Sequence, residues 1–429
     1  MSAAKRDSFG SSFAVIMAYA GSAIGLGNLW RFPYMAGENG GAAFIFIYLI
    51  CTLLLSLPIF LAEAVIGRHA QLNAVGSMKK LAPKSFWNIL GILSVLTPTV
   101  LLSYYSIVGG WSVEYFLRSF NLNYGEFLPS GYKALAFGTV MLGITCLVVA
   151  CGVKNGIEKF SKYSIPALFL FIIIIMVYAL RLPGATKGVE YLIHPDFSKI
   201  TGRTIVAAIG QSFYSMSLGS GIILTYSSYV SKKENMMTSG IWTAISSIIF
   251  AIIAGFAIMP AVFAKGIDPE SGPGLLFVTL PEIFVQMGQA SPFLGRAISV
   301  LFFLTVVVAA LTSTISLVEP GIAWLVEEKR IPRRKACIIM FSVIWLIGVG
   351  SAFSQEIFGF VDNLCSNILL IFGALIAVLF VGWKMDKTAV QDELTNKGSC
   401  NTGIYKLVYF AIRYLAPATL IVVFIFNFI

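Results

Sequence analysis

The sequence predicts an all-α integral membrane protein with about eleven transmembrane helices, two of them unwound midway. The chain of 429 residues is 58% hydrophobic and 12% charged, whereas soluble domains carry about 25% charged residues. Its apolar residues gather in segments that reach the roughly 20 residues needed to cross a bilayer. Two of these segments carry glycines and polar residues at their centre, where a helix that only spans the membrane would be apolar.

Eleven apolar segments are expected to form the spans, because their pattern is helical and lacks the ten-residue alternation of barrel strands. The segments cover residues 10–36, 41–67, 87–117, 134–151, 163–181, 202–230, 239–264, 293–325, 335–353, 357–383 and 404–428. An odd number of crossings places the two chain ends on opposite sides of the membrane.

The first segment is interrupted within residues 20–33, which hold three glycines, an asparagine and an arginine. Each glycine costs about 1 kcal/mol relative to alanine in a helix interior, so the cluster predicts a break. Carbonyls freed at a break can bind a cation, and freed N–H groups can hold an anion. Glycines also serve simply to bring membrane helices close together. Asn28 and Arg31 favour the binding site, because polar groups inside the membrane are costly and usually functional.

The sixth and eighth segments carry further polar residues at mid-membrane. Residues 211–221 read Gln-Ser-Phe-Tyr-Ser-Met-Ser-Leu-Gly-Ser-Gly, and residues 312–316 hold four hydroxyls in five positions. Some of these hydroxyls bond back to the preceding turn of their own helix. Interrupted helices at corresponding places in two halves indicate an inverted-repeat transporter. We therefore expect one domain over 1–429, with a 5+5 inverted repeat (about 10–181 and about 202–383) and an extra helix at about 404–428.

Glu63 stands near the end of the second segment and has two interpretations that the sequence leaves open. Its carboxylate could cap the helix at the membrane interface. It could instead accept hydrogen bonds from the spare N–H groups of the unwound first helix.

The net charge of +10 is a topology signal, because the basic residues concentrate before the first segment and in alternate loops. The positive-inside rule then places the N-terminus in the cytoplasm and the C-terminus outside. We expect a multi-pass protein of the cell (inner) membrane, embedded in the lipid bilayer, with no nucleic-acid partner. The six cysteines lie in predicted helices or on the cytoplasmic side, so no disulfide framework is expected.

An enzymatic function is not expected. Only two histidines exist, His69 and His194, and both fall in predicted loops. No metal cluster and no pairing of a nucleophile with a base stands out in the sequence.

The interrupted segments resemble those of the neurotransmitter:sodium symporter family. The resemblance rests on residues 21–34 (Gly-Ser-Ala-Ile-Gly-Leu-Gly-Asn-Leu-Trp-Arg-Phe-Pro-Tyr), on 37–41, on 210–219 and on 311–317. It covers essentially the whole chain and implies the LeuT-type fold and sodium-coupled uptake by alternating access. Most members have twelve helices, and the eleven-helix form is similar to several bacterial members.

By this resemblance, one or two Na⁺ ions would be bound in cages of oxygen atoms, which suit a hard cation. The first cage would use the carbonyls of Gly21, Ile24 and Ala309 with the hydroxyls of Thr312 and Ser313. The second would use the Ala23 carbonyl, Asn28, Ser215 and Ser247, where the family usually has Asn or Asp in place of that last serine. Chloride use is not assigned, because a family position that holds Ser or an acid falls on Phe250 or Ala251.

The resemblance also implies an α-amino acid as the transported solute. Backbone N–H groups at Leu26 and Gly27 and the Tyr105 hydroxyl would bind its carboxylate beside sodium and Ser313. Its ammonium would meet the carbonyls of Ala23 and Tyr214, with Ser215 and Ser217 nearby. Monoamine carriers of the family hold an Asp where this chain has Gly25, so a monoamine is disfavoured.

The side chain of the solute should meet Leu101, Tyr214, Ser220 and Leu317. Ser220 stands where a bulky apolar residue is frequent in the family, which leaves a wider pocket. We expect a large neutral side chain, with tyrosine or tryptophan preferred over leucine, unless a neighbouring side chain fills the gap.

Two gates follow from the same resemblance. Arg31 and Asp362 would pair across the outer vestibule, above a lid formed by Tyr105 and Tyr214. The inner latch would involve Arg6, Phe9, Tyr229 and Glu327. Intact gates favour transport over the alternative function, a non-transporting amino-acid sensor of the same fold. We expect a monomer or weak dimer.

Overall fold

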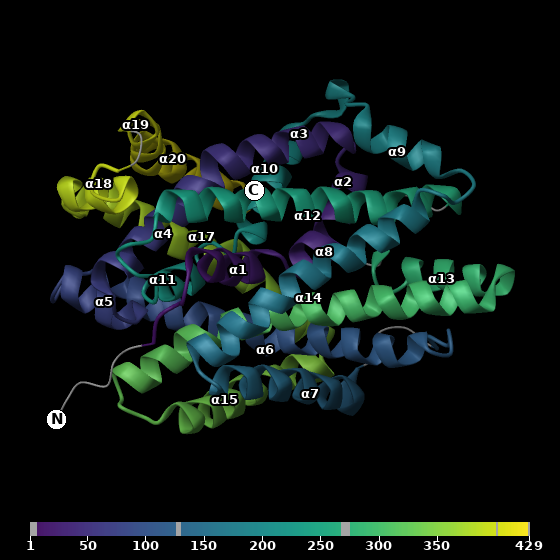
Figure 1. Ribbon diagram of the computed structural model, residues 1–429, viewed down its shortest axis with the longest axis horizontal. Helices are drawn as coiled ribbons and strands as arrows, with labels where there is room; N and C mark the ends of the chain where they lie inside the picture. The colour runs from purple at the N-terminus through teal and green to yellow at the C-terminus, as the bar shows by residue number, and fades with distance from the viewer. Residues whose placement is uncertain (1–6, 126–129, 267–274, 400–401, 428–429) are drawn as a thin grey trace.

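The computed structural model describes residues 7–125, 130–266, 275–399 and 402–427, and these contain helices, turns and loops but no strand. Nine of the described helices are long and apolar enough to cross a membrane, and a tenth span is formed by a bent pair of helices. The spans run side by side along the long axis of the molecule (Figure 1). The two longest helices, α6 and α14, pack against each other in the interior.

Several spans are built from more than one helical piece, joined by π-helical turns. The continuous spans are α6 (Asn88–Ser119), α7 (Gly131–Ala150), α12 (Met236–Ala264), α14 (Pro292–Glu327) and α15 (Arg333–Phe353). A further span joins a π-helical turn, Val153–Glu158, to α8 (Lys159–Ala179). The composite spans are α3 (Ala42–Cys51) with α4 (Leu57–Ala70), α16 (Gln355–Asn363) with α17 (Leu370–Leu379), and α19 (Thr402–Phe410) with α20 (Ala416–Phe426).

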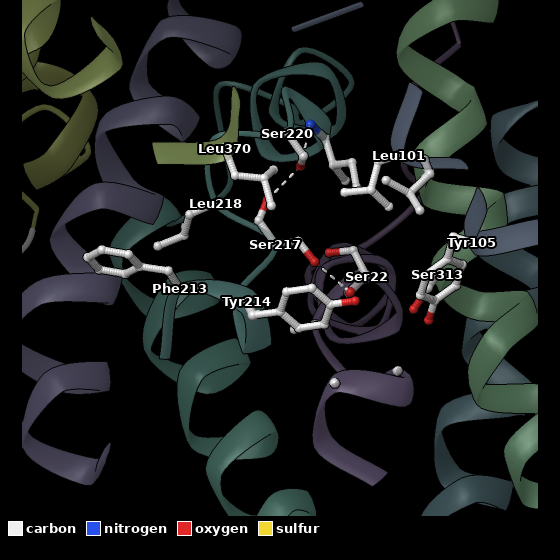
Figure 2. Close-up of a pocket in the computed structure, with 15 residues that line it drawn as sticks. Ser22, Leu101, Tyr105, Phe213, Tyr214, Ser217, Leu218, Ser220, Ser313 and Leu370 are labelled. Carbon is white, nitrogen blue, oxygen red and sulfur yellow. Dashed lines mark hydrogen bonds between the residues drawn. The ribbon is translucent and has the colours of Figure 1, made fainter. Parts of the chain in front are cut away.

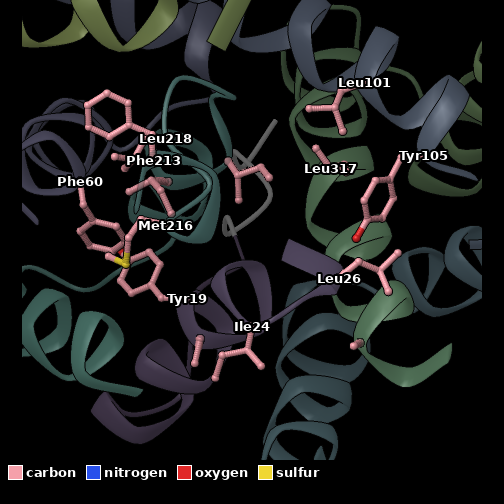
Figure 3. Packing of buried hydrophobic residues seen from close by; sticks show 14 of the residues in the cluster. Tyr19, Ile24, Leu26, Phe60, Leu101, Tyr105, Phe213, Met216, Leu218 and Leu317 are labelled. Atoms are coloured by element: carbon pink, nitrogen blue, oxygen red, sulfur yellow. The ribbon is translucent and has the colours of Figure 1, made fainter. Parts of the chain in front are cut away.

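The first span is broken between α1 (Ser12–Ala23) and a π-helical turn, Gly27–Arg31, that leads into α2 (Phe32–Glu38). The two halves are bent by 55°. The last turn of α1 is anchored by Tyr19, whose ring packs edge-on against Phe60 of α4 with centroids 5.0 Å apart (Figure 3). Helix α1 therefore ends shortly after a residue that is firmly packed against α4.

The sixth predicted segment consists of α10 (Gly202–Ser215) and α11 (Ile222–Ser227), each too short to cross a membrane alone. Residues 216–221 between them are not helical. Ser217, Gly219 and Gly221 take positive φ angles of 55°, 73° and 74°, which glycine adopts readily and which end a helix. This arrangement is why fewer long helices than eleven are counted among the described residues.

Glu63 is fully buried at the side of this non-helical segment. Its Oε1 accepts a hydrogen bond of 2.7 Å from the backbone N–H of Gly219. The carboxylate therefore holds the unwound part of the sixth segment. The sequence left two interpretations of Glu63 open, an interfacial cap and an acceptor for the first helix. The observed contact with Gly219 is neither of these.

Short helices cover the two ends of the bundle. α5 (Ala74–Leu81) and α18 (Lys387–Thr395) lie at the end from which the chain starts, while α9 (Ala185–Ile193) and α13 (Thr279–Ala290) lie at the opposite end (Figure 1). An interfacial helix was expected within 69–86 and a helical part within 265–292, and α5 and α13 occupy these places.

α18 is fastened to the bundle by a cluster of charges around Glu393. Its carboxylate pairs with Arg68 at 2.5 Å and with Lys232, and its Oε1 lies 3.2 Å from Nδ1 of His69. Burial alone would raise the pKa of Glu393, but the hydrogen bond with His69 and the positive charges of Arg68 and Lys232 lower it to about 2. The ionised carboxylate thus stabilises the folded state.

Acid should weaken the attachment of α18 to the bundle as the pH falls from 4.5 to about 2. A pKa lowered from 4.5 to about 2 gives stability that is fully present above 4.5 and is lost as the pH falls through about 2. We expect Glu393→Gln to flatten the dependence of the thermal unfolding midpoint on pH below 5. Asp392→Asn, on the exposed side of the same helix, is the control, and equal flattening in both variants would contradict the role of Glu393.

Candidate functional site

A narrow cavity of about 50 Å³ lies between the two interrupted spans (Figure 2). Its walls come from both breaks and from α6, α14 and α17. The lining residues are Ser22, Ala23, Gly25, Gly27, Leu101, Tyr105, Phe213, Tyr214, Ser217, Leu218, Ser220, Ile222, Ser313, Leu317 and Leu370. None of these described residues carries a charged side chain, so the cavity suits a solute with no net charge.

Hydroxyl groups fix the non-helical segment of the sixth span against the first. The Ser217 hydroxyl donates to the carbonyl of Ser22 at 2.7 Å, and the Ser220 hydroxyl donates to the carbonyl of Ser217 at 2.6 Å (Figure 2). The Ser220 side chain therefore faces the cavity with its hydrogen already used. This leaves a small, weakly polar wall at position 220.

On the opposite wall the Tyr105 hydroxyl interacts with the Ser313 side chain and with the backbone of Leu26. Gly25 lies directly against Ser313, since a Cβ at Gly25 would stand 2.0 Å from the Ser313 Oγ. No side chain fits at position 25 unless Ser313 moves. The hydroxyls of Tyr105 and Ser313 thus meet the unwound backbone at one point.

One group of oxygen atoms forms between the first break and α14. The Thr312 hydroxyl lies 3.1 Å from the carbonyl of Ile24 and 2.8 Å from that of Ala309. Three of the five residues predicted for the first cage, Ile24, Ala309 and Thr312, therefore meet here. Gly21 packs against Ser161 of α8, and Ser313 faces Gly25.

A second polar group forms around Asn28, which is fully buried. The Asn28 amide donates to the Ser247 hydroxyl at 2.8 Å and to the Ser247 carbonyl at 3.2 Å. The Ser247 hydroxyl in turn donates to the carbonyl of Ser215 at 3.4 Å. The structure therefore brings together Asn28, Ser247 and Ser215, three of the four residues predicted for the second cage.

Two buried amide oxygen atoms in this group have no hydrogen-bond partner. They are Oδ1 of Asn28 and Oε1 of Gln211. The amide of Gln211 donates to the carbonyl of Gly27 at 2.9 Å and to the Ser215 hydroxyl at 3.1 Å. A buried acceptor without a donor is costly, and the Asn28 oxygen is suited to a hard cation.

A wider cavity of about 400 Å³ opens beyond Tyr105 and Tyr214, which line both cavities. Arg31 and Asp362 also line this vestibule, so the predicted outer gate residues are brought together. They form no ion pair here: the Arg31 guanidinium lies 4.9 Å from the Tyr214 ring centroid, and Asp362 accepts a hydrogen bond from Ser366 at 3.1 Å.

The side opposite the vestibule is closed by packing around Phe9. The Phe9 backbone N–H donates to the Tyr229 carbonyl at 3.1 Å, and its ring lies edge-on to Tyr229. The Tyr229 hydroxyl donates to buried Glu319, which pairs with Arg333 at 2.5 Å. These two charged residues were absent from the predicted latch.

Of the two remaining residues of the predicted latch, the structure describes only Glu327. Glu327 accepts hydrogen bonds from the backbone and side chain of Asn73 at 2.7 and 3.1 Å. Arg6 lies outside the described residues. The central cavity adjoins the hollow vestibule, from which it is separated by Tyr105 and Tyr214.

Nine of the eleven predicted solute-binding residues line the central cavity, whereas Leu26 and Ser215 do not. Leu26 lines the vestibule. The prediction from the sequence missed Ser22, Phe213, Leu218, Ile222 and Leu370. The first three adjoin predicted residues and could have been included, whereas Ile222 and Leu370 lie in apolar stretches that carry no signal.

A bundle of membrane spans with two broken helices around an uncharged cavity, hollow on one side and packed on the other, defines a secondary membrane transporter. A sequence model of the sodium:neurotransmitter symporter family matches residues 6–126 and 133–429. The chain therefore belongs to this family, whose members are transporters and not enzymes.

Individual relatives agree with this placement. An uncharacterized sodium-dependent transporter of Bacillus subtilis is 35% identical over 99% of this chain and 98% of its own. Another, from Methanocaldococcus jannaschii, is 30% identical over 94% of this chain and 87% of its own. The crystal structure of MhsT in complex with L-phenylalanine covers 98% of this chain and 99% of that chain, with 36% identity and a TM-score of 0.88.

These findings confirm the predicted all-α, LeuT-type membrane fold, and they support sodium-dependent transport of a small molecule by a multi-pass membrane protein. No group of three or more His, Cys, Asp or Glu side chains suited to a metal occurs within the described ranges.

Proposed function

We propose that this protein imports a neutral L-α-amino acid with a large, preferably aromatic, side chain, together with one or two sodium ions. The observation that carries the proposal is the uncharged cavity between two helix breaks, with Tyr105 and Ser313 on one wall. A zwitterion has no net charge and presents two ends that backbone groups can recognise. Unwound N–H groups and the Tyr105 hydroxyl would bind the carboxylate, and carbonyls across the cavity would bind the ammonium.

The similar structure of MhsT with L-phenylalanine supports the choice of an aromatic amino acid. The small Ser220 side chain faces the side-chain end of the cavity near Leu101 and Leu317. Because the cavity is narrow in this state, a large solute requires Tyr214 and its neighbours to adjust as the lid opens and closes.

Sodium would occupy the two oxygen groups. The Ile24 and Ala309 carbonyls with Thr312 would form one site, completed by the Gly21 carbonyl and the Ser313 hydroxyl. Asn28, Ser215 and Ser247 with the Ala23 carbonyl would form the other, beside the solute carboxylate. Sodium and solute would then each strengthen binding of the other, since coupling between sites is reciprocal.

Alternating access would proceed by opening and closing the two sides in turn. Arg31 and Asp362 would pair when the vestibule closes, and Phe9 with Tyr229 would separate when the opposite side opens. A buried pair gains little net energy against its desolvation cost, which suits a gate that must reopen. We propose that the vestibule faces outward, with the N-terminus in the cytoplasm and the C-terminus outside the cell membrane, and that the halves 10–181 and 202–383 are inverted repeats.

Binding of the twenty amino acids to the purified protein tests the solute assignment. Scintillation proximity or calorimetry in sodium chloride should detect tyrosine, tryptophan or phenylalanine, and potassium chloride should abolish the signal. Tighter binding of leucine or glycine than of the aromatic amino acids would contradict the assignment. Sodium-independent binding would contradict the coupling.

Replacing Ser220 by phenylalanine should shift the preference toward smaller solutes. The new ring would fill the space beside Leu101 and Leu317, so binding of tryptophan should weaken by about tenfold or more relative to leucine, a difference of about 1.4 kcal/mol. Competition binding against a labelled amino acid measures the ranking. Ser342→Phe, at an exposed position of α15, is the control and should leave the ranking unchanged, whereas an unchanged ranking in Ser220→Phe would remove Ser220 from the pocket.

A further inference from the structure

A groove of about 600 Å³ lies where α5 meets α6, α14 and α15, far from the central cavity. Of these elements, α5 lies at the end of the bundle from which the chain starts (Figure 1). The groove is larger than the vestibule and the central cavity. It touches the last turns of α14, the helix whose middle carries Ala309 and Thr312.

The wall of the groove is apolar and open to the surroundings of the protein. Ile92 and Leu96 of α6 are 58% and 48% exposed, and Ile339 and Val343 of α15 are 40% and 39% exposed. The one hydroxyl in the wall, that of Thr99, donates to the carbonyl of Val95 at 2.7 Å. Such a wall matches hydrocarbon.

The rim of the groove is positively charged. Lys79 of α5 pairs with Glu328 at 2.5 Å and is 61% exposed, and Lys329 lies 5.6 Å from the Trp324 ring. The charged residues that line the groove are two lysines, Lys79 and Lys329, and one acid, Glu328. Glu328 is already paired with Lys79, so the rim carries one positive charge in excess.

We propose that this groove binds an anionic diacyl phospholipid. The acyl chains would lie along Ile92, Leu96 and Val343, and the phosphate would lie between Lys79 and Lys329. Basic pockets between membrane helices on the cytoplasmic side bind anionic head groups, and lysine stems can run along apolar surface while their charge reaches the interface. A zwitterionic head group would place its own cation against the excess of positive charge at the rim.

Lipid binding to the full chain tests this proposal. The protein, delipidated in a neutral maltoside detergent, is titrated with phosphatidylglycerol or with phosphatidylcholine of identical chains, and bound lipid is counted by native mass spectrometry. One phosphatidylglycerol should be retained at least fivefold more tightly than phosphatidylcholine. It should also raise the thermal midpoint, because a ligand that binds only the folded state stabilises it.

Two variants locate the site. Lys79→Gln/Lys329→Gln should weaken phosphatidylglycerol binding by about fivefold for each lysine removed. Lys159→Gln/Lys162→Gln removes two exposed lysines at the start of α8 and should change nothing. Leu96→Trp fills the groove but keeps the rim, and should weaken binding of long-chain lipid without lowering amino-acid binding.

Equal retention of the two lipids, or equal losses in both lysine pairs, would overturn the proposal in favour of unspecific lipid contact. Unchanged binding in Leu96→Trp would overturn the groove as the place of the acyl chains. Dimer formation through this face, detected as a mass of two chains that added lipid does not dissociate, would assign the groove to a second copy and would also overturn it.

Discussion

Gly27→Ala should abolish sodium-dependent amino-acid binding, with at least a hundredfold loss of affinity. A Cβ at Gly27 would stand 2.6 and 2.8 Å from two ring carbons of Tyr214, well inside van der Waals contact. The Tyr214 ring is rigid and forms the wall between the central cavity and the vestibule. In the variant the Tyr214 ring would have to move away from this wall, and the lid that it forms would be lost. Equilibrium binding of a labelled amino acid to the purified variant measures the loss.

The control for this variant is Gly143→Ala on α7, where a Cβ would meet nothing within 4 Å. It should bind like the parent chain and unfold at the same temperature or slightly higher, since alanine favours the helix. Normal binding by a folded Gly27→Ala protein would show that Tyr214 does not form the lid.

Asn28→Ala should weaken binding of both sodium and solute by about a hundredfold. The substitution removes the unpartnered Asn28 Oδ1 that is proposed to bind the cation, and it leaves the Ser247 carbonyl and hydroxyl without their donor. The loss of a buried interaction with a charge is worth about 3 kcal/mol, which corresponds to this factor. Sodium titrations at fixed solute, and solute titrations at fixed sodium, measure both affinities.

Asn39→Ala provides the matched control, because the Asn39 amide bonds only locally, to the Met35 carbonyl at 2.9 Å. A folded Asn28→Ala protein with both affinities intact would remove Asn28 from the site. A loss for the solute alone would place Asn28 beside the solute and not beside sodium.

Much of the fold could be predicted from the sequence, because the lipid bilayer imposes strong constraints on composition. A polar run such as 211–221 is rare in a membrane span, so both interruptions stood out, and most of the cavity lining then followed from the resemblance to the symporter family. The described residues contain nine long helices and one bent pair, because Ser217, Gly219 and Gly221 divide the sixth segment into pieces that are short on their own.

Contacts between distant residues were harder to predict. The carboxylate of Glu63 reaches Gly219 across the bundle, and no local pattern distinguishes this partner from the first helix. In the sequence, Glu319 and Arg333 look like ordinary charged residues near helix ends. In the structure they form a buried ion pair behind Tyr229. Leu370 contributes an apolar wall from an apolar helix, so only the three-dimensional packing reveals it.

The central claim is that a sodium gradient drives amino-acid movement through this bundle. The most direct measurement is uptake of radiolabelled tyrosine, tryptophan or phenylalanine into proteoliposomes. An inward sodium gradient should cause transient accumulation above the external concentration, and an ionophore that collapses the gradient should abolish it. Sodium-dependent binding with no uptake at any gradient would contradict the account and would assign the protein a sensing role.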